Sequence, residues 1–167
     1  MDTSINNAID NLARQVASST IVNPLLIGIH TGGVWVAELL HQKIGFSEEL
    51  GTLDISFYRD DFSRVGLNPQ VKASFLPVRI EDRNIILIDD VLYTGRTIRA
   101  ALNEIFSYGR PASVKLGVLI KRTGRELPIQ SDFIGMELDL DIHQQAKLYR
   151  DNDKLGLSVE EVNISEK

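Results

Sequence analysis

Residues 85–98 constrain the fold of this chain more than any other segment. Four aliphatic residues, Ile85 to Ile88, run into the adjacent carboxylates Asp89 and Asp90, and a loop with hydroxyl groups and a glycine then leads into a helical pattern. This order predicts a buried strand that ends in two acids and turns into the N-terminus of a helix. Carboxylates suit a sugar diol or a metal-bound ligand, and a helix N-terminus suits a phosphate. The segment therefore predicts a site for a ribose 5-phosphate.

Strands and helices are predicted to alternate on both sides of this segment. The predicted elements are a helix from Ser4 to about Val16, a strand over 24–29, a helix over 34–43, a strand over 50–58, a strand over 85–88, a helix over 97–108, a strand over 114–120 and a short strand at 133–134. Such alternation predicts an α/β fold with a mainly parallel central sheet flanked by helices. The acidic tail beyond Gly135 shows little pattern.

Composition limits the class of protein. The 167 residues are 43% hydrophobic, which predicts one compact domain over 1–167. The absence of cysteine excludes a disulfide scaffold, a thiolate nucleophile and a cysteine-based zinc site. The N-terminus lacks a signal-peptide pattern, and no apolar run could span a membrane, so we expect a cytoplasmic protein.

Charge is unevenly distributed along the chain. The net charge of −5 argues against general affinity for nucleic acid. Basic residues are nevertheless in excess between Arg59 and Arg125, whereas acidic residues dominate the rest of the sequence. A basic middle fits a phosphate-rich ligand held centrally, and the alternative is that these charges simply lie on solvated faces.

Two further loops are candidate binding segments. His30-Thr31-Gly32-Gly33 follows the first predicted core strand, and its glycines permit an unusual backbone that exposes N–H groups to an anion. The alternative is a plain turn between a strand and a helix. Residues 59–77 form a polar stretch too long for a simple connection, so we expect a mobile, functional loop. Its cations Arg59, Arg64 and Lys72 are candidate anion contacts, although each alone is more often a solvated surface charge.

The segment 85–98 resembles the phosphoribosyl pyrophosphate (PRPP) signature of the type I phosphoribosyltransferases: a hydrophobic strand, Asp-Asp, a loop and Thr-Gly-x-Thr. The sequence has no Gly-Lys-Ser/Thr and no Gly-x-Gly-x-x-Gly, so neither of those nucleotide-binding motifs is indicated. Three stretches together resemble the PyrR family of pyrimidine-operon attenuators and uracil phosphoribosyltransferases, and the similarity runs from about Gly28 to Gly135. These stretches are residues 54–61, residues 89–97, and residues 125–129 with the following 132–135.

The resemblance implies a type I phosphoribosyltransferase fold with a mobile loop over about 59–77 and a small hood over about 122–167. It implies that Asp89 and Asp90 bind the ribose hydroxyls with Mg²⁺ nearby, held directly or through water, and that Arg59 is catalytic. The implied 5-phosphate loop is Val91, Leu92, Tyr93, Thr94, Gly95, Arg96 and Thr97; the implied pyrophosphate loop is His30, Thr31, Gly32 and Gly33; Lys121 and Arg122 would lie near the base.

The implied reaction converts uracil and PRPP to UMP and pyrophosphate. The implied partners are PRPP, uracil, UMP, a pyrimidine-operon leader mRNA and further copies of the chain, as a dimer or higher oligomer. Two alternatives remain open: an RNA-binding attenuator with weak or no catalysis, and a phosphoribosyltransferase for another base, such as a purine or orotate.

Two departures from the family pattern bear on these roles. Gly32 stands where the family usually has an arginine in the pyrophosphate loop. Residues 121–125 read Lys-Arg-Thr-Gly-Arg where the family usually reads Asp-Arg-Gly-His-Arg. The first departure concerns the pyrophosphate side of the site, and the second concerns the side that would meet the base or RNA.

Overall fold

The structure is a computed structural model that describes residues 3–56 and 74–164. Within these residues, a helix precedes each of the first four strands except the third, and three more strands follow. The elements are α1 (Thr3–Ala17), β1 (Leu25–Ile29), α2 (Gly32–Ile44), β2 (Gly51–Leu53), β3 (Asn84–Leu92), α3 (Arg96–Tyr108), β4 (Ser113–Arg122), β5 (Phe133–Leu138), β6 (Gln144–Asp151) and β7 (Lys154–Glu161).

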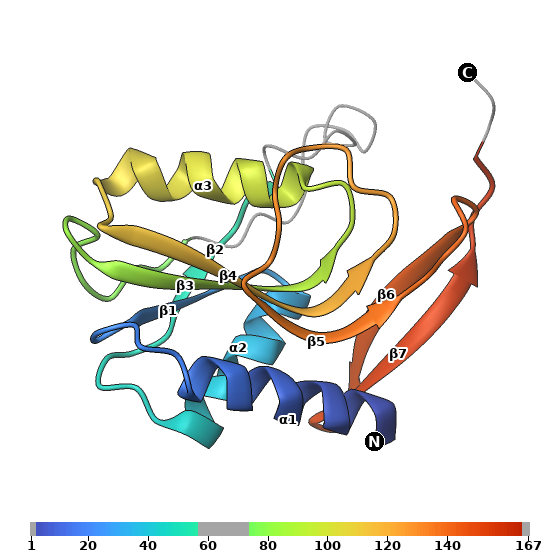
Figure 1. The fold of residues 1–167 in the computed structure, drawn as a ribbon, viewed down its shortest axis with the longest axis horizontal. Coiled ribbons are helices and arrows are strands. Elements are labelled where there is room, and N and C mark those ends of the chain that lie inside the picture. Colours follow the sequence, from blue (N-terminus) through green and yellow to red (C-terminus); the bar gives the residue numbers. More distant parts are fainter. Residues whose placement is uncertain (1–2, 57–73, 165–167) are drawn as a thin grey trace.

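Five of the strands form one parallel sheet in the order β2-β1-β3-β4-β5. Helix α3 covers one face of the sheet, and α1 and α2 cover the other (Figure 1). The predicted α/β fold with a mainly parallel sheet flanked by helices is therefore confirmed.

The core lies on both faces of the central strands. Ile86 and Ile88 of β3 pack in the cluster with α1 and α2, whereas Ile85 and Leu87 pack in the cluster with α3. All four side chains are fully buried. A strand buried on both faces reads as a continuous apolar run, which is why β1 and β3 were the clearest strands in the sequence.

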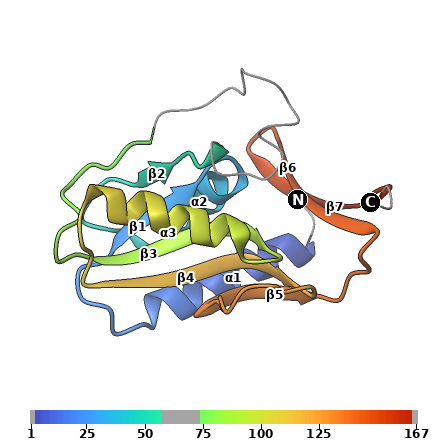
Figure 2. The same cartoon turned by 90° about the horizontal axis from the view of Figure 1, so that it is seen from above.

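The β6–β7 hairpin was not predicted, because the tail after Gly135 was expected to have little pattern. The hairpin lies beyond the end of the sheet to which β3 and β4 point (Figures 1 and 2). Its turn is formed by Asn152 and Asp153, both with positive φ, as a two-residue hairpin turn requires. Apolar residues such as Ala146 and Leu148 alternate with polar ones along β6. The many charged residues between them hid this alternation in the sequence.

Other boundaries also differ from the prediction. β2 ends at Leu53 instead of continuing to residue 58, and residues 57 and 58 lie outside the described part of the chain. β5 is longer than the predicted 133–134 and pairs with β4, so the first part of the range expected to form a hood belongs to the main sheet. Among the described residues, no helix is long and apolar enough to cross a membrane.

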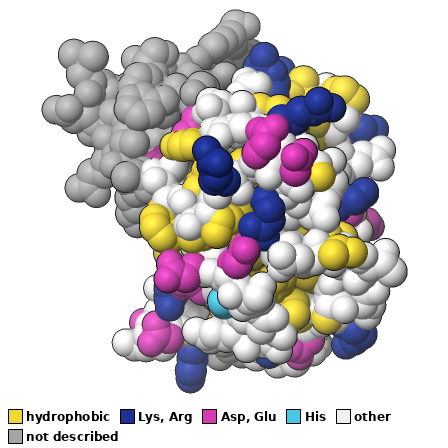
Figure 3. All heavy atoms as spheres, turned by 90° about the vertical axis from the view of Figure 1, so that its left-hand side faces the viewer, with side chains coloured by type: hydrophobic (Ala, Val, Ile, Leu, Met, Phe, Trp, Pro, Cys, Tyr) yellow, Lys and Arg dark blue, Asp and Glu magenta, His cyan; other side chains and the backbone are white. Residues whose placement is uncertain are grey.

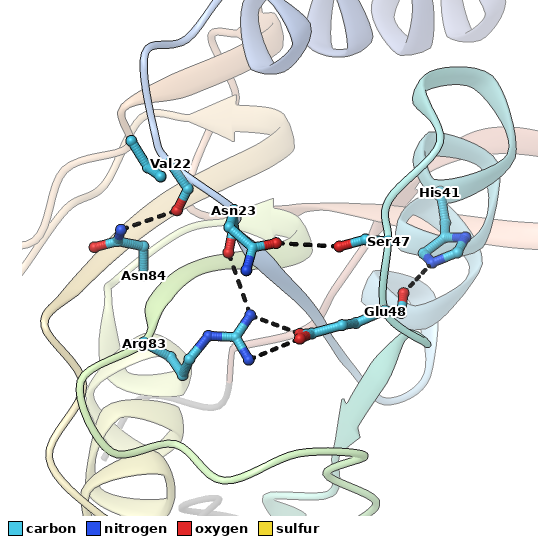
Figure 4. Close-up of polar contacts among 7 residues, drawn as sticks. All are labelled: Val22, Asn23, His41, Ser47, Glu48, Arg83 and Asn84. Carbon is cyan, nitrogen blue, oxygen red and sulfur yellow. Dashed lines mark hydrogen bonds and ion pairs between the residues drawn. The ribbon is translucent and has the colours of Figure 1, made fainter.

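Loops at the amino ends of the strands are joined by one polar network (Figure 4). The guanidinium of Arg83 donates two hydrogen bonds to the carboxylate of Glu48, at 2.9 and 2.6 Å, and one to the carbonyl oxygen of Asn23 at 3.2 Å. On the surface at this end of the molecule, acidic and basic side chains are interspersed (Figure 3). Basic side chains therefore do not form a patch of one sign on this face.

Candidate functional site

The loop after β1 and the carboxyl end of β3 lie against each other. β1 pairs with β3 in parallel, with Gly28 opposite Ile88, so the residues that follow these two positions share one edge of the sheet. A Cβ atom on Gly33 would be 2.7 Å from the carbonyl oxygen of Ile88, and one on Gly32 would be 2.7 Å from Cγ of Asp90. Only glycine permits such an approach. The fold thus brings together the two segments that the sequence singled out.

Asp89 and Asp90 lie inside β3, and not after its end as the sequence predicted. β3 continues because its ladder with β4 extends to Leu92, which pairs with Lys121. Successive side chains of a strand point to opposite faces, yet both carboxylates reach the first turn of α2. A Cβ atom on Gly33 would be 3.2 Å from Oδ1 of Asp89, and one on Gly32 would overlap Oδ2 of Asp90. Asp89 is buried, with 4% of its surface exposed, and Asp90 is half-buried.

Backbone N–H groups orient both carboxylates. Asp90 N–H donates to Oδ1 of Asp89 at 2.9 Å, and Val91 N–H donates to Oδ1 of Asp90 at 2.8 Å. Charge-assisted hydrogen bonds of this kind stabilise the ionised carboxylate. Carboxylate oxygens are the groups that a sugar hydroxyl or a metal ion would use.

The loop between β3 and α3 has the geometry of an anion site. Gly95 adopts a left-handed conformation (φ 97°), and Arg96 N–H donates to Oγ1 of Thr94 at 3.2 Å. The first N–H groups of an α-helix have no partner within the helix, and its dipole favours negative charge there. Val91 and Leu92, predicted as part of this loop, lie in β3, and their side chains pack in the core. The loop itself is therefore Tyr93 to Thr97.

The residues between β1 and α2 form a second helix N-terminus. The sequence predicted a helix from residue 34, whereas α2 begins at Gly32, so only His30 and Thr31 connect strand and helix. The peptide bond between them is cis. The N–H groups of the first turn of α2 and those of α3 both follow the carboxyl ends of parallel strands. Two helix N-termini therefore belong to the same edge of the sheet.

A neighbouring segment clamps the loop before α3. The carbonyl oxygen of Thr94 accepts hydrogen bonds from Glu126 N–H and Leu127 N–H, each at 3.0 Å. The side chain of Glu126 also forms an ion pair with Arg96 at 3.1 Å. The sequence did not predict these contacts, although residues 125–129 belong to one of the three stretches that resemble the family.

A cavity of about 200 Å³ lies beside this loop, at the end of β4. Tyr93, Lys121, Arg122, Gly124 and Arg125 are among its lining residues. Lys121 forms an exposed ion pair with Glu137 at 3.5 Å. Arg122 is buried instead, and its guanidinium carbon lies 3.9 Å from the centroid of the Tyr93 ring. The structure places Lys121 and Arg122 at this cavity, with differently directed side chains.

The predicted catalytic Arg59 and the candidate contacts Arg64 and Lys72 lie outside the described residues. The described flanks of that segment are joined: Thr52 and Phe75 exchange backbone hydrogen bonds of 2.7 and 2.8 Å, and Asp54 N–H donates to Oγ of Ser74 at 3.1 Å. The described residues on either side of that segment therefore lie together beside β2.

The donor set fits a magnesium ion that arrives with a phosphorylated substrate. Mg²⁺ prefers hard oxygen ligands and is usually held by one or two carboxylates together with substrate phosphates. Asp89 and Asp90 supply such oxygens. Among residues 3–56 and 74–164, no group of three or more His, Cys, Asp or Glu side chains could hold a metal ion by itself.

Comparison with known proteins places the chain in a family. The sequence model of the phosphoribosyl transferase domain matches residues 2–152. The "Bifunctional protein PyrR" of Nitrosococcus oceani is 52% identical over 168 residues, which are 99% of this chain and 94% of that protein. This chain belongs to the PyrR family. The PyrR protein of Pseudomonas aeruginosa is 54% identical over 138 residues, or 83% of this chain and 81% of that protein.

Solved structures agree with the fold of a PyrR-family protein. A purine phosphoribosyltransferase from Pyrococcus horikoshii has a TM-score of 0.63 at 21% identity, covering 83% of this chain and 85% of that one. A hypoxanthine-guanine phosphoribosyltransferase from Bacillus anthracis has a TM-score of 0.65 at 18% identity, covering 83% and 81%. At such low identity these structures show the fold alone, which is that of the type I phosphoribosyltransferases.

The departures of this PyrR-family chain from the usual pattern have structural counterparts. Gly32 gives the carboxylate of Asp90 its space. The hydroxyl of Thr123 donates to the carbonyl oxygen of Leu140 at 2.9 Å and accepts from its N–H at 3.1 Å. Gly124 lies against the ring of Tyr93. Each departure is therefore accommodated by a neighbour in the site.

Proposed function

We propose that this chain transfers the phosphoribosyl group of PRPP to uracil and forms UMP and pyrophosphate. The observation that carries the proposal is the meeting of Asp90 with the first turn of α2, next to the left-handed Gly95 and the start of α3. PRPP presents one phosphate, a sugar diol and a pyrophosphate on one small scaffold. Two helix N-termini and two carboxylates at one edge of a sheet match these groups.

The roles follow from charge. Cleavage of the bond between the anomeric carbon and pyrophosphate leaves positive charge on the ribose ring and negative charge on the leaving group. The N–H groups at the start of α2, after His30 and Thr31, would stabilise the leaving pyrophosphate. Asp89 and Asp90 would orient the ribose hydroxyls and offset the ring charge. The loop Tyr93 to Thr97 would hold the 5-phosphate.

Magnesium is part of the proposal as a companion of PRPP. Asp89 and Asp90 would hold the ion, directly or through water, and the bound ion would neutralise pyrophosphate charge. Arg59 would contact the reacting groups. Lys121 would lie beside the base in the cavity at the end of β4, where its ammonium group can donate to a carbonyl oxygen of uracil.

A substrate panel tests this function. Purified protein is given PRPP, Mg²⁺ and, in turn, uracil, orotate, hypoxanthine or guanine, and pyrophosphate release is measured. We expect release with uracil and none with the other bases. Release with a purine or with orotate alone would replace uracil by that base, and release with no base would contradict the transferase function.

A second function is favoured by the near full-length relative, which is called bifunctional. We propose that the chain also binds a pyrimidine-operon leader mRNA in response to UMP, as a homo-oligomer in the cytoplasm, with residues 1–167 forming one domain. Filter binding of leader RNA with and without UMP tests this role, and affinity should fall steeply as salt increases. Equal retention of an unrelated RNA would contradict it.

A further inference from the structure

Arg122, the last residue of β4, is a buried cation with 6% of its surface exposed. Its Nη1 donates to the carbonyl oxygen of Gln144 at 2.6 Å, and its Nη2 donates to that of Asp141 at 3.1 Å. Its Nε donates to the carbonyl oxygen of Thr123 at 3.1 Å. All three nitrogens of the guanidinium therefore donate to backbone carbonyl oxygens, which belong to the β4–β5 loop, to the connection between β5 and β6 and to the first residue of β6.

The flat face of the same guanidinium lies over Tyr93, with Cζ 3.9 Å from the ring centroid. Gly124 packs on this ring as well: a Cβ atom there would be 3.1 Å from Cδ2 of Tyr93 and would overlap Cε2. Gly124 also has a φ of 113°, which side chains rarely tolerate. Contacts with Arg122 and Gly124 thus fix the position of the Tyr93 ring.

These contacts join the two halves of the site. Tyr93 directly precedes Thr94 and the rest of the loop proposed to bind the 5-phosphate, whereas Arg122 belongs to the cavity proposed for the base. We propose that Arg122 is a positioning residue: it fixes Tyr93 against the β5–β6 connection and thereby holds the 5-phosphate loop in place for PRPP. This inference rests on the proposed function, and it gives Arg122, which was expected to lie near the base, a role other than contact with the base.

The hydrogen bonds that Arg122 donates to backbone carbonyl oxygens argue against a contact between its guanidinium and the base. A ligand that took one of these bonded N–H groups would leave the carbonyl oxygen of Gln144 or Asp141 without this donor. The ring of Tyr93 also covers one face of the guanidinium, where a cation–π contact is favourable.

The test compares Arg122→Met, Tyr93→Leu and the double variant by their KM for PRPP and for uracil and by the Kd for PRPP alone. We expect each single variant to raise the KM and Kd for PRPP about tenfold, which corresponds to about 1.4 kcal/mol. The KM for uracil should stay within about twofold, and the double variant should be no weaker for PRPP than the weaker single variant. Arg122→Lys keeps the charge and should show a smaller rise, which provides a second variant if Arg122→Met does not fold.

Arg83→Met is the matched control. Arg83 is also an arginine shielded from solvent and bound by a carbonyl oxygen, but it lies at the amino ends of the strands, among Asn23 and Glu48 (Figure 4). Its loss should lower the melting temperature without changing either KM. If Arg122→Met likewise changed only the melting temperature, Arg122 would be a purely structural residue and the inference would be overturned.

Three other outcomes are decisive. A higher KM for uracil with an unchanged Kd for PRPP would make Arg122 a base contact and overturn the inference. Fully additive effects of the Arg122 and Tyr93 variants would overturn the link between them. A wild-type chain that bound PRPP but left uracil unused would overturn the proposed acceptor only, because the expected change in the Kd for PRPP needs no base.

Discussion

Gly32 makes room for the carboxylate of Asp90: a methyl group on Gly32 would overlap Oδ2 and lie 2.7 Å from Cγ. The first turn of α2 and the end of β3 are therefore fitted to each other at the level of single atoms. An arginine, which the family usually has at this position, would require Asp90 to take another rotamer or the loop to move. The place of the acid in this chain depends on the absence of a side chain at residue 32.

Gly32→Ala should lower kcat/KM for PRPP by about tenfold or more, since a displacement of about 1 Å near the reacting groups can reduce the rate a hundredfold. Steady-state assays that vary PRPP at saturating uracil measure this loss. Gly45→Ala, at the other end of α2 with open space around it, is the control and should lower stability without affecting activity. Full activity of Gly32→Ala would contradict the fitted contact.

Replacement of both acids, Asp89→Asn with Asp90→Asn, should abolish UMP formation and leave the fold intact. The amide keeps the size of each side chain and removes the charge that orients ribose and offsets the ring. Residual turnover should fall by at least about a hundredfold, the scale seen when one group that stabilises charge in a transition state is lost. Circular dichroism and thermal melting serve as controls for folding. Unchanged turnover would contradict the proposed role of Asp89 and Asp90 in binding the ribose.

Gly95→Ala should weaken PRPP binding and lower stability by about 1–2 kcal/mol, because Gly95 is left-handed and other residues are strained there. A Cβ atom at this position would also be 3.3 Å from Cβ of Leu127, so the clamp on Thr94 would have to shift. Calorimetric titration with PRPP and urea unfolding measure the two effects. A Kd for PRPP equal to that of wild type would show that this loop does not bind the ligand.

Removal of either member of the Arg83–Glu48 pair should lower the free energy of unfolding by about 1–3 kcal/mol, because the pair is largely shielded from solvent and bidentate. The double variant Arg83→Met with Glu48→Gln should be less destabilised than the sum of the single changes. Urea titrations of the four chains supply the comparison, and additive losses would mean that the two groups act independently.

Much of the fold was accessible from sequence because its signals are local. β1, β3 and α3 are marked by an apolar run or a helical period, and the Asp-Asp and Thr-Gly-x-Thr motifs pointed to the edge of the sheet where the site lies. The predicted end of β3 was wrong. Asp89 and Asp90 lie within the strand because it pairs with β4 as far as Leu92, and the length of a neighbouring strand cannot be read from local sequence.

The interior contacts of the site were beyond such reasoning. The burial of Arg122 depends on carbonyl oxygens of Asp141 and Gln144, some twenty positions further along the chain. The sequence predicted a strand that ends at residue 120, whereas β4 continues to Arg122. It also could not show which way the guanidinium of Arg122 points. The overlap of Gly32 with Asp90 likewise arises only when β1 and β3 lie side by side.

The clamp on Thr94 has a consequence for redesign of the site. Its carbonyl oxygen accepts hydrogen bonds from Glu126 N–H and Leu127 N–H, so the segment that lines the cavity proposed for the base is joined to the loop proposed to bind the 5-phosphate. A transplant of residues 121–129 from another phosphoribosyltransferase would import a new acceptor pocket and, with it, a new anchor for Thr94. Successful grafts should therefore exchange residues 93–97 in the same step.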